Sequence, residues 1–297
     1  MFFGGAFEAA TEDDLKRAAA LPGAGSILDS EFPGGGKVVR IRDPDGVLFN
    51  VVYGYETLAV RPPPKSAEVF NVAQQNDDEK PRLGKYQRLE KGPAAVFKLG
   101  HVGHISHDVG KISTWYQENF NLRAMDIQAD MIDETQVSQT SRGRPVTRRI
   151  QTNKRRTKDF AVFYCLDLGK HYADHHCFFH FQKFPDQKYS GPHHASFEVY
   201  DTDVQLQGHY HLVSKGYKLM WGVGRHLLGS QIFDYWYDTD GFIVEHYTDG
   251  DVVNEDNESA RLALTRDDYT TWGAEFNDLK GSFTGDTSPP AEMILTN

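Results

Sequence analysis

Short stretches that alternate apolar and polar residues recur along the chain, and two long segments arrange them in the same order. The first segment reads GGAFEAATEDDLKRAAALPG and then PGGGKVVRIRDPDGVLFNVVYG; the second reads HHASFEVYDTDVQLQGHYHLVSKG and then GSQIFDYWYDTDGFIVEHYTDG. Each segment predicts a short strand, a helix that begins at Thr or acidic capping residues, and later strands joined by an Asp-x-Asp-Gly turn.

A third segment repeats the opening half of this pattern. In GHVGHISHDVGKISTWYQENFNLRAMDI, a strand leads through His107 and Asp108 into a helix that carries Trp115, Tyr116 and Phe120. The strands DFAVFYCLDLG and HHCFFHFQ follow. The unit is therefore a βαβββ module, and a repeat of this size cannot bury its sheet alone. The three copies span residues 1–56, 98–183 and 192–249.

These repeats predict an α+β fold with a defined domain order. We expect a partial N-terminal module at residues 1–60, a Pro-rich and charged linker at 61–97, a catalytic domain of two modules at 98–250, and a polar C-terminal tail at 251–297. Trp272 and Phe276 are the expected aromatic anchor of the tail. The basic run Ser141–Asp159 predicts a solvated surface insertion, with a lid or a subunit contact as the alternative.

Composition narrows the functional classes. With 297 residues, of which 39% are hydrophobic, the chain can bury a sizeable core. A formal net charge of −10 argues against nucleic acid as the main partner. Only Cys165 and Cys177 occur, which argues against a disulfide scaffold. No apolar run reaches the roughly 20 residues of a membrane span, and the first residues lack a signal-peptide pattern, so we expect a cytoplasmic protein without a membrane partner.

Histidine is the informative residue type. All 13 histidines fall between His101 and His246, and the flanking segments contain none. Clustered imidazoles indicate a metal site or a proton-transfer site in the middle of the chain.

The last module carries two groups that can bind a metal. His194 precedes Phe197 by three residues, and Glu245 follows Asp240 by five. Both lie in predicted strands of that module.

The first module lacks such groups at the matching points. The residue three positions before Phe7 is Gly4, and the residue five positions after Asp45 is Asn50. One copy with metal-capable groups and one without is the pattern expected of a catalytic module beside a degenerate one.

A third donor is expected from the first strand of the middle module, because pairing two modules brings their opening strands together. His101, His104 and His107 are the candidates. Alternation puts His101 and His107 on one face and His104 on the other. His107 abuts the turn before the helix, so His101 is the preferred donor and His104 its competitor.

Two imidazoles and one carboxylate form the 2-His-1-carboxylate facial triad, which suits Fe(II) and leaves coordination positions open. His101, His194 and Glu245 are therefore the predicted metal ligands. They offset only one of the two charges of the ion, so an anionic substrate is favoured. Mn(II) is the alternative metal, because the same donors accept it.

Residues 1–249 resemble the type I extradiol dioxygenases of the vicinal oxygen chelate superfamily, which also contains glyoxalases and bleomycin-resistance proteins. The motifs that carry the resemblance are KLGHVGHISHD, ADHHCFFHF, GPHHASFEV, WGVGRHLLGSQIFDYWYDTDG and EHYTDGD. The resemblance implies Fe(II), O2 as co-substrate and a small-molecule catecholic substrate whose ring is opened beside its hydroxyl pair. It assigns the metal ligands to the same three residues, His101, His194 and Glu245.

The resemblance also implies catalytic roles for His176, His226 and Tyr235. Tyr235 and His226 would hydrogen-bond the substrate oxygens and take up a proton, and His176 would act as an acid–base group. His175 and His193 are adjacent alternatives to His176 and His194. Because strand neighbours point to opposite faces, we expect only one of each pair to face the site. The residues expected to line it are Trp221, Phe179, Phe181 and His180.

The chain departs from the resembled pattern in one respect, since the family has four modules and the first is missing here. A lone module leaves an exposed apolar sheet face and an unpaired edge. Either the gene is truncated or the module packs on another subunit, so we expect a homo-oligomer. The alternative functions are a glyoxalase-like metal-dependent isomerase or lyase, and a non-catalytic binding protein of the same superfamily. The middle module shows no Glu that corresponds to Glu245, which argues against the isomerase.

Overall fold

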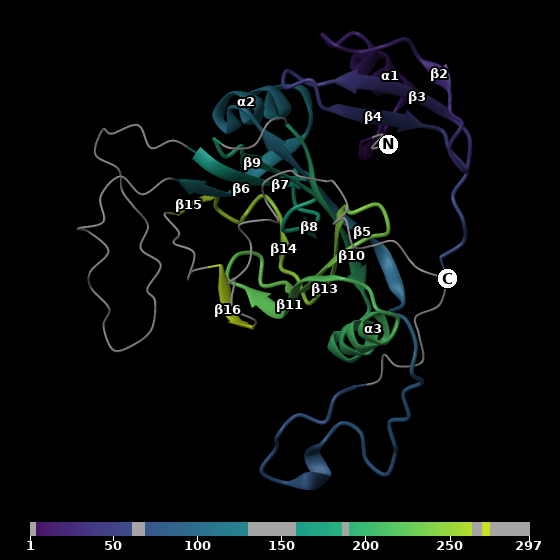
Figure 1. Ribbon diagram of the computed structural model, residues 1–297, viewed down its shortest axis with the longest axis vertical. Helices are drawn as coiled ribbons and strands as arrows, with labels where there is room; N and C mark the ends of the chain where they lie inside the picture. Colours follow the sequence, from purple (N-terminus) through teal and green to yellow (C-terminus); the bar gives the residue numbers. More distant parts are fainter. Residues whose placement is uncertain (1–3, 61–68, 130–158, 186–189, 263–268, 274–297) are drawn as a thin grey trace, which may run out of the picture.

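The computed structural model describes residues 4–60, 69–129, 159–185, 190–262 and 269–273 (Figure 1). Strands dominate this part of the chain, and the α-helices in it are short, so the predicted α+β class is confirmed. None of the described helices has the length and the apolar character that crossing a membrane requires.

The N-terminal unit is a small sheet with one helix. Its elements are β1 (Ala6–Glu8), α1 (Glu12–Ala19), β2 (Leu28–Asp29), β3 (Lys37–Arg42) and β4 (Leu48–Tyr53). The helix begins where the sequence predicts it, because Thr11 and Asp14 form a reciprocal capping box. The strand order is β1-β4-β3-β2, with β1 parallel to β4.

The middle and last units follow the same plan. The middle unit contains β5 (Val96–Ser106), α2 (Val109–Asn119), β6 (Leu122–Ala129), β7 (Asp159–Leu166) and β9 (Phe178–Gln182). The last unit contains β10 (Gly191–Val199), α3 (Thr202–Ser214), β11 (Leu219–His226), β12 (Ile232–Tyr237) and β13 (Ile243–Thr248). The remaining short elements are η1 (Asp77–Glu79), β8 (Ala173–Asp174), β14 (Val252–Val253), β15 (Ala260–Leu262) and β16 (Thr270–Gly273).

One continuous sheet joins the middle and last units. Its order is β15-β6-β7-β9-β5-β10-β13-β12-β11-β16. The opening strands β5 and β10 pair antiparallel at its centre, and each runs parallel to the closing strand of its own unit, β9 or β13. Opening strand beside closing strand is also the arrangement of the N-terminal unit. The topology therefore brings the two opening strands side by side, as the repeat pattern predicts.

The N-terminal unit shares its core with the middle unit. Leu15 of α1 and Phe49 of β4 belong to the same apolar cluster as Ile112 and Tyr116 of α2 and Tyr164 of β7. In Figure 1 the N-terminal strands accordingly lie next to the α2 end of the large sheet. The two units are packed as one body through this core.

The exposed apolar face expected of the N-terminal unit is not seen on β3. Val38, Val39 and Ile41 occupy both faces of this strand, and all three are buried. Val39 and Ile41 face α1 and the shared core. Val38 points to the other face of the strand and is buried there too.

The C-terminal segment also differs from the expected tail. β15 pairs with β6 and β16 pairs with β11, so both extend the edges of the large sheet. Trp272 lies in β16 and is half-exposed, and Phe276 lies outside the described residues. The basic run also lies outside them, apart from Asp159, which opens β7.

Candidate metal centre

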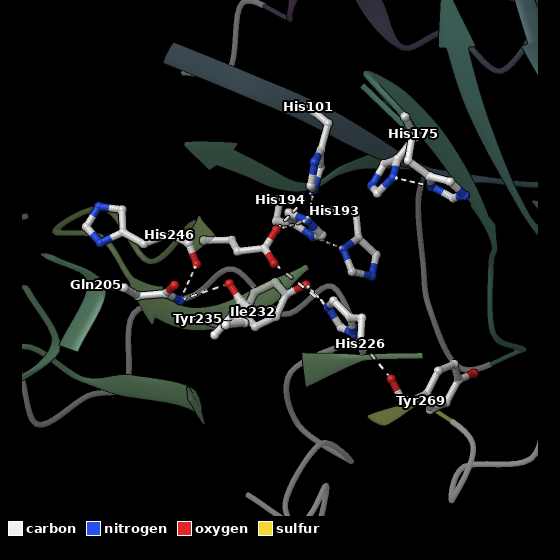
Figure 2. Close-up of polar contacts among 12 residues, drawn as sticks. His101, His175, His193, His194, Gln205, His226, Ile232, Tyr235, His246 and Tyr269 are labelled. Atoms are coloured by element: carbon white, nitrogen blue, oxygen red, sulfur yellow. Dashed lines mark hydrogen bonds and ion pairs between the residues drawn. The ribbon is translucent and has the colours of Figure 1, made fainter. Parts of the chain in front are cut away.

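Three neighbouring strands at the middle of the large sheet supply the predicted metal ligands. His101 lies on β5, His194 on β10 and Glu245 on β13. Ser196 of β10 pairs with His101 on one side and with Glu245 on the other. Residues of one row share a face of the sheet, and His194, two residues before Ser196, shares it too. Figure 2 shows the imidazoles of His101 and His194 pointing toward one another.

The donor atoms form a small triangle. His101 Nε2 lies 3.1 Å from His194 Nε2 and 3.0 Å from Glu245 Oε2, and His194 Nε2 lies 3.3 Å from the same oxygen. Two donors that each lie roughly 2.1 Å from one ion, at about 90° to each other, are about 3 Å apart. The triangle therefore fits a single divalent transition-metal ion.

Burial determines how the charge of this triangle can be balanced. Glu245 is 0% exposed, and His101 and His194 are 2% and 8% exposed. Burial alone would raise the pKa of Glu245, but contacts with His101, His194 and His226 hold this pKa well below its usual value. Burial lowers the pKa of His194, so its imidazole is neutral, which is the form that binds metals. A buried carboxylate with ring nitrogens on either side of it is a favourable place for a cation.

A second pair of side chains extends from the triangle. His226 Nε2 and the Tyr235 hydroxyl are 2.9 Å apart, and His226 Nδ1 lies 3.3 Å from the carbonyl oxygen of Tyr269 (Figure 2). With Nδ1–H donating to that carbonyl, Nε2 accepts from the tyrosine hydroxyl. Burial, and then the charge of Glu245, raise the pKa of Tyr235 well above its usual value. The pair forms a hydrogen-bonded path beside the carboxylate.

His176 lies on the other side of His101, with their ring centroids 4.2 Å apart. Its Nδ1 is 3.2 Å from His175 Nδ1, and His175 Nε2 is 3.0 Å from an Asp126 carboxylate oxygen. Burial, and then the nearby His101 and His175, lower the pKa of His176 well below its usual value. The three residues form a chain that begins at β6 and ends against His101, one of the predicted metal ligands.

Sequence reasoning missed Asp126. The signal was available, because LRAMDIQA places one carboxylate in a mainly apolar strand, and Asp126 is buried there. Buried carboxylates need a partner, and His175 is the partner here.

The expectation that only one histidine of each adjacent pair faces the site does not hold for His193 and His194, because His193 Nδ1 lies 2.8 Å from His194 Nδ1. In the other pair, His176 contacts His101, whereas His175 contacts Asp126. Strict alternation fails at His193 because the pairing of β10 with β5 shifts register between Pro192 and Ala195. His193 therefore supports His194 through its second ring nitrogen, as groups around metal-bound histidines commonly do.

The strand register identifies what replaces a second carboxylate. In the last unit, Ser196 lies two residues after His194 and pairs with Glu245. In the middle unit, Gly103 lies two residues after His101 and pairs with Phe179. Phe179 thus stands where the middle unit could have carried an acid. In the N-terminal unit, Ala6 lies two residues after Gly4 and pairs with Asn50. The strand pairing therefore matches the comparison made from the sequence.

Three of the four residues expected to line the site are near it. Phe179 contacts His194, Phe181 stacks on His193, and the ring of Trp221 stacks on Tyr235. The expectation that His180 lines the site is wrong, because its side chain points to the opposite face of β9. Its ring contacts Tyr116 and Phe178, which belong to the core shared with the N-terminal unit.

Comparisons with known proteins point to one group of enzymes. No family model matches the chain. A curated relative, metapyrocatechase 2 from Cupriavidus necator, is 25% identical over 239 residues, which cover 80% of this chain. The chain spans 61% of the length of that relative.

Solved structures share the fold. An extradiol ring-cleaving dioxygenase from Brevibacterium fuscum superposes with a TM-score of 0.62 at 17% identity, covering 91% of this chain and 63% of the other. Homoprotocatechuate 2,3-dioxygenase from Arthrobacter globiformis gives 0.60 at 16%, covering 91% and 69%. A Mn(II)-bound glyoxalase from Novosphingobium aromaticivorans gives 0.59 at 18%, covering 90% and 70%. The resemblance to extradiol dioxygenases and the fold inferred from it are thereby confirmed.

Proposed function

We propose that the chain is an extradiol dioxygenase that binds Fe(II) through His101, His194 and Glu245 and inserts both atoms of O2 into a catecholic ring beside its hydroxyl pair. The observation that carries the proposal is the buried triangle of two imidazole nitrogens and one carboxylate oxygen, 3.0 to 3.3 Å apart. The similarity to metapyrocatechase 2 supports the choice of reaction.

The donor set explains why iron suits this site. One carboxylate offsets one of the two charges of the ion, so a substrate that binds as an anion is attracted. When bound, Fe(II) supplies open coordination positions for catechol and O2 and the one-electron chemistry that O2 needs. Mn(II) is accepted by the same donors.

The Tyr235–His226 pair accepts the proton that a catechol loses on binding. A substrate hydroxyl donates to the Tyr235 oxygen while the Tyr235 hydroxyl donates to His226 Nε2, 2.9 Å away. The proton gained by the pair is then held on His226 Nε2, close to the Glu245 carboxylate at 3.8 Å. That charge stabilises the protonated imidazole.

His176 is the proposed acid–base group on the other side of the ligands. Because Nδ1 is engaged with His175, Nε2 is the atom that exchanges a proton with the reacting oxygen. Asp126 holds the His175 ring through Nε2, which fixes the orientation of the chain.

We also propose that the enzyme acts in the cytoplasm as a homo-oligomer on a small catecholic molecule. The net charge of −10 disfavours a nucleic-acid partner, and we propose no membrane partner.

The direct test is ring cleavage by the full chain. The protein is loaded anaerobically with Fe(II), mixed with a panel of monocyclic and bicyclic catechols, and exposed to air. We expect O2 uptake equal to the substrate consumed and a yellow ring-opened product. Iron-loaded protein that takes up no O2 with any member of a broad panel overturns the proposal.

Tyr235→Phe tests the proton path. The variant keeps the ring that stacks on Trp221 but removes the hydroxyl, so we expect iron content to be unchanged and kcat to fall roughly 10- to 100-fold. Tyr237→Phe, two residues along the same strand, is the matched control and should retain kcat. Equal rates for Tyr235→Phe and Tyr237→Phe contradict the assigned role.

A metal-dependent isomerase is the second candidate, since a Mn(II)-bound glyoxalase shares the fold. Phe179 argues against it, because this residue stands where a second carboxylate ligand would lie. The two functions separate in one measurement: an isomerase converts its substrate without consuming O2.

A further inference from the structure

A second group of metal-capable side chains lies away from the proposed catalytic site. Asp43, His104 and His180 each offer a ligand atom, all three atoms lie within 4.8 Å of one another, and all three residues are buried. Asp43 belongs to the N-terminal unit, whereas His104 and His180 lie on β5 and β9 of the middle unit. The group therefore spans the shared core.

Strand register separates this group from the first. His101 and His104 are an odd number of residues apart on β5, so they point to opposite faces. His104 and His180 are register partners on the parallel strands β5 and β9, which places both imidazoles on the same face. Their ring centroids are 6.0 Å apart, compared with 5.2 Å for His101 and His194.

Asp43 is held in place by its own turn. One carboxylate oxygen accepts hydrogen bonds from the backbone N–H groups of Asp45 and Val47 at 3.0 and 2.9 Å. The other accepts the Tyr116 hydroxyl of α2 at 3.1 Å. The turn thus presents the carboxylate to the middle unit rather than to solvent.

His180 has a ring nitrogen that points to a ligand. Its Nδ1 lies 3.2 Å from the Tyr164 hydroxyl oxygen. Its Nε2 is fully buried and has no hydrogen-bond partner among the described residues. An unsatisfied buried polar atom costs about 1–3 kcal/mol, so such an atom calls for an ion or a water. With Nδ1–H donating to Tyr164, Nε2 keeps the lone pair that a metal needs.

We propose that Asp43, His104 and His180 bind a second divalent metal ion, Zn(II) by preference, which fastens the N-terminal unit to the middle unit. Two imidazoles and one carboxylate are ligands that Zn(II) takes. Three protein ligands leave the fourth tetrahedral position of Zn(II) to a buried water, and a site closed off from solvent, with ligands from two units, suits a structural role. The two imidazole rings are wider apart than at the first site, so we expect binding to draw them together.

Metal stoichiometry tests the proposal without any activity assay. The full chain is stripped with a chelator, incubated with Zn(II), desalted and analysed for zinc per chain. We expect two equivalents for the unsubstituted chain. His180→Phe, which fits the surrounding aromatic rings, and Asp43→Asn should each bind one. The exposed control His171→Gln should bind two.

The double variant His194→Asn, Glu245→Gln isolates the second site. It should bind one equivalent, and Zn(II) should raise its thermal midpoint by an amount that grows with concentration. Adding His180→Phe should abolish both effects. Because these readouts concern metal content and melting, they separate this proposal from the catalytic one.

Two outcomes are decisive. One equivalent that is lost in the double variant but kept in His180→Phe overturns the second site and leaves the first intact. One equivalent that is kept in the double variant and lost in His180→Phe supports the second site and speaks against the first.

Discussion

Burial lowers the pKa of the His104 imidazole. The side chain is 0% exposed, and burial lowers its pKa to about 4, whereas an unfolded histidine titrates near 6.5. As the pH falls below about 6.5, the unfolded chain takes up a proton that the folded chain refuses until about pH 4. The free energy of unfolding therefore falls as the pH falls through this window, and the contribution of His104 is fully present above it.

The corresponding prediction compares the chain with His104→Phe in the metal-free state. Between pH 7.5 and pH 5, the unsubstituted protein should lose about 2 kcal/mol more of its free energy of unfolding than the variant does. Urea unfolding at the two pH values measures this difference. His171→Gln, at an exposed position, should behave like the unsubstituted protein. An equal loss in His104→Phe and the unsubstituted protein contradicts the buried, neutral imidazole.

At the scale of single residues, sequence reasoning succeeds where alternation is regular. The period of two puts His101 and His104 on opposite faces, and the structure has them so. It fails at His193, because a register shift between Pro192 and Ala195 turns two adjacent rings to the same side. Nothing in the local sequence fixes where such a shift occurs. The roles of the site residues stay predictions until variants are measured.

At the scale of elements, the contact between β5 and β9 depends on a residue without a side chain. A Cβ on Gly103 would lie 1.7 Å from Cζ of Phe179, so the aromatic ring occupies the space above this glycine. Phe179 in turn contacts His194. The packing of the two strands thus controls the surroundings of His194, a proposed metal ligand.

Gly103→Ala should therefore lower the free energy of unfolding by about 1–3 kcal/mol, because Phe179 must move. Gly110→Ala is the control: its Cβ would meet only Asp108 at an ordinary 3.5 Å in the first turn of α2, and it should be neutral or stabilising by roughly 0.5 kcal/mol. Chemical unfolding of both variants checks the prediction. Equal stability of the two variants counts against the contact.

Elements with strong local signals are the ones that the sequence predicts. Thr11 and Asp108 cap α1 and α2 at the expected positions, because capping acts over three residues. The edge strands β15 and β16 carry no comparable signal, since their pairing with β6 and β11 depends on residues far away in the sequence. The contact of Asp43 with the middle unit escapes prediction for the same reason.

At the scale of the whole molecule, Phe49 joins two units. Its ring contacts Phe7 of its own unit and Trp115, Tyr116 and Phe120 of the middle unit, and it is 1% exposed. A shared core of this kind makes the units unfold together rather than one after the other.

Phe49→Ala should lower the free energy of unfolding by about 3–5 kcal/mol and keep a single transition. Hydrogen exchange at the β13 amides, far from the substitution, should accelerate along with exchange at β4. Phe70→Ala, at an exposed position, should change neither. If β13 keeps its protection while β4 loses it, the N-terminal unit and the large sheet unfold independently.

The three proposed catalytic ligands are residues 101, 194 and 245 of one polypeptide, and they meet only when β5, β10 and β13 lie side by side. During synthesis, a ribosome must release almost the whole large sheet before the last of them is available. Such long-range pairing is among the slower steps of folding. Capture of the ion should therefore be a late event, and a half-made chain carries isolated histidines that cannot yet hold iron or expose it to oxygen.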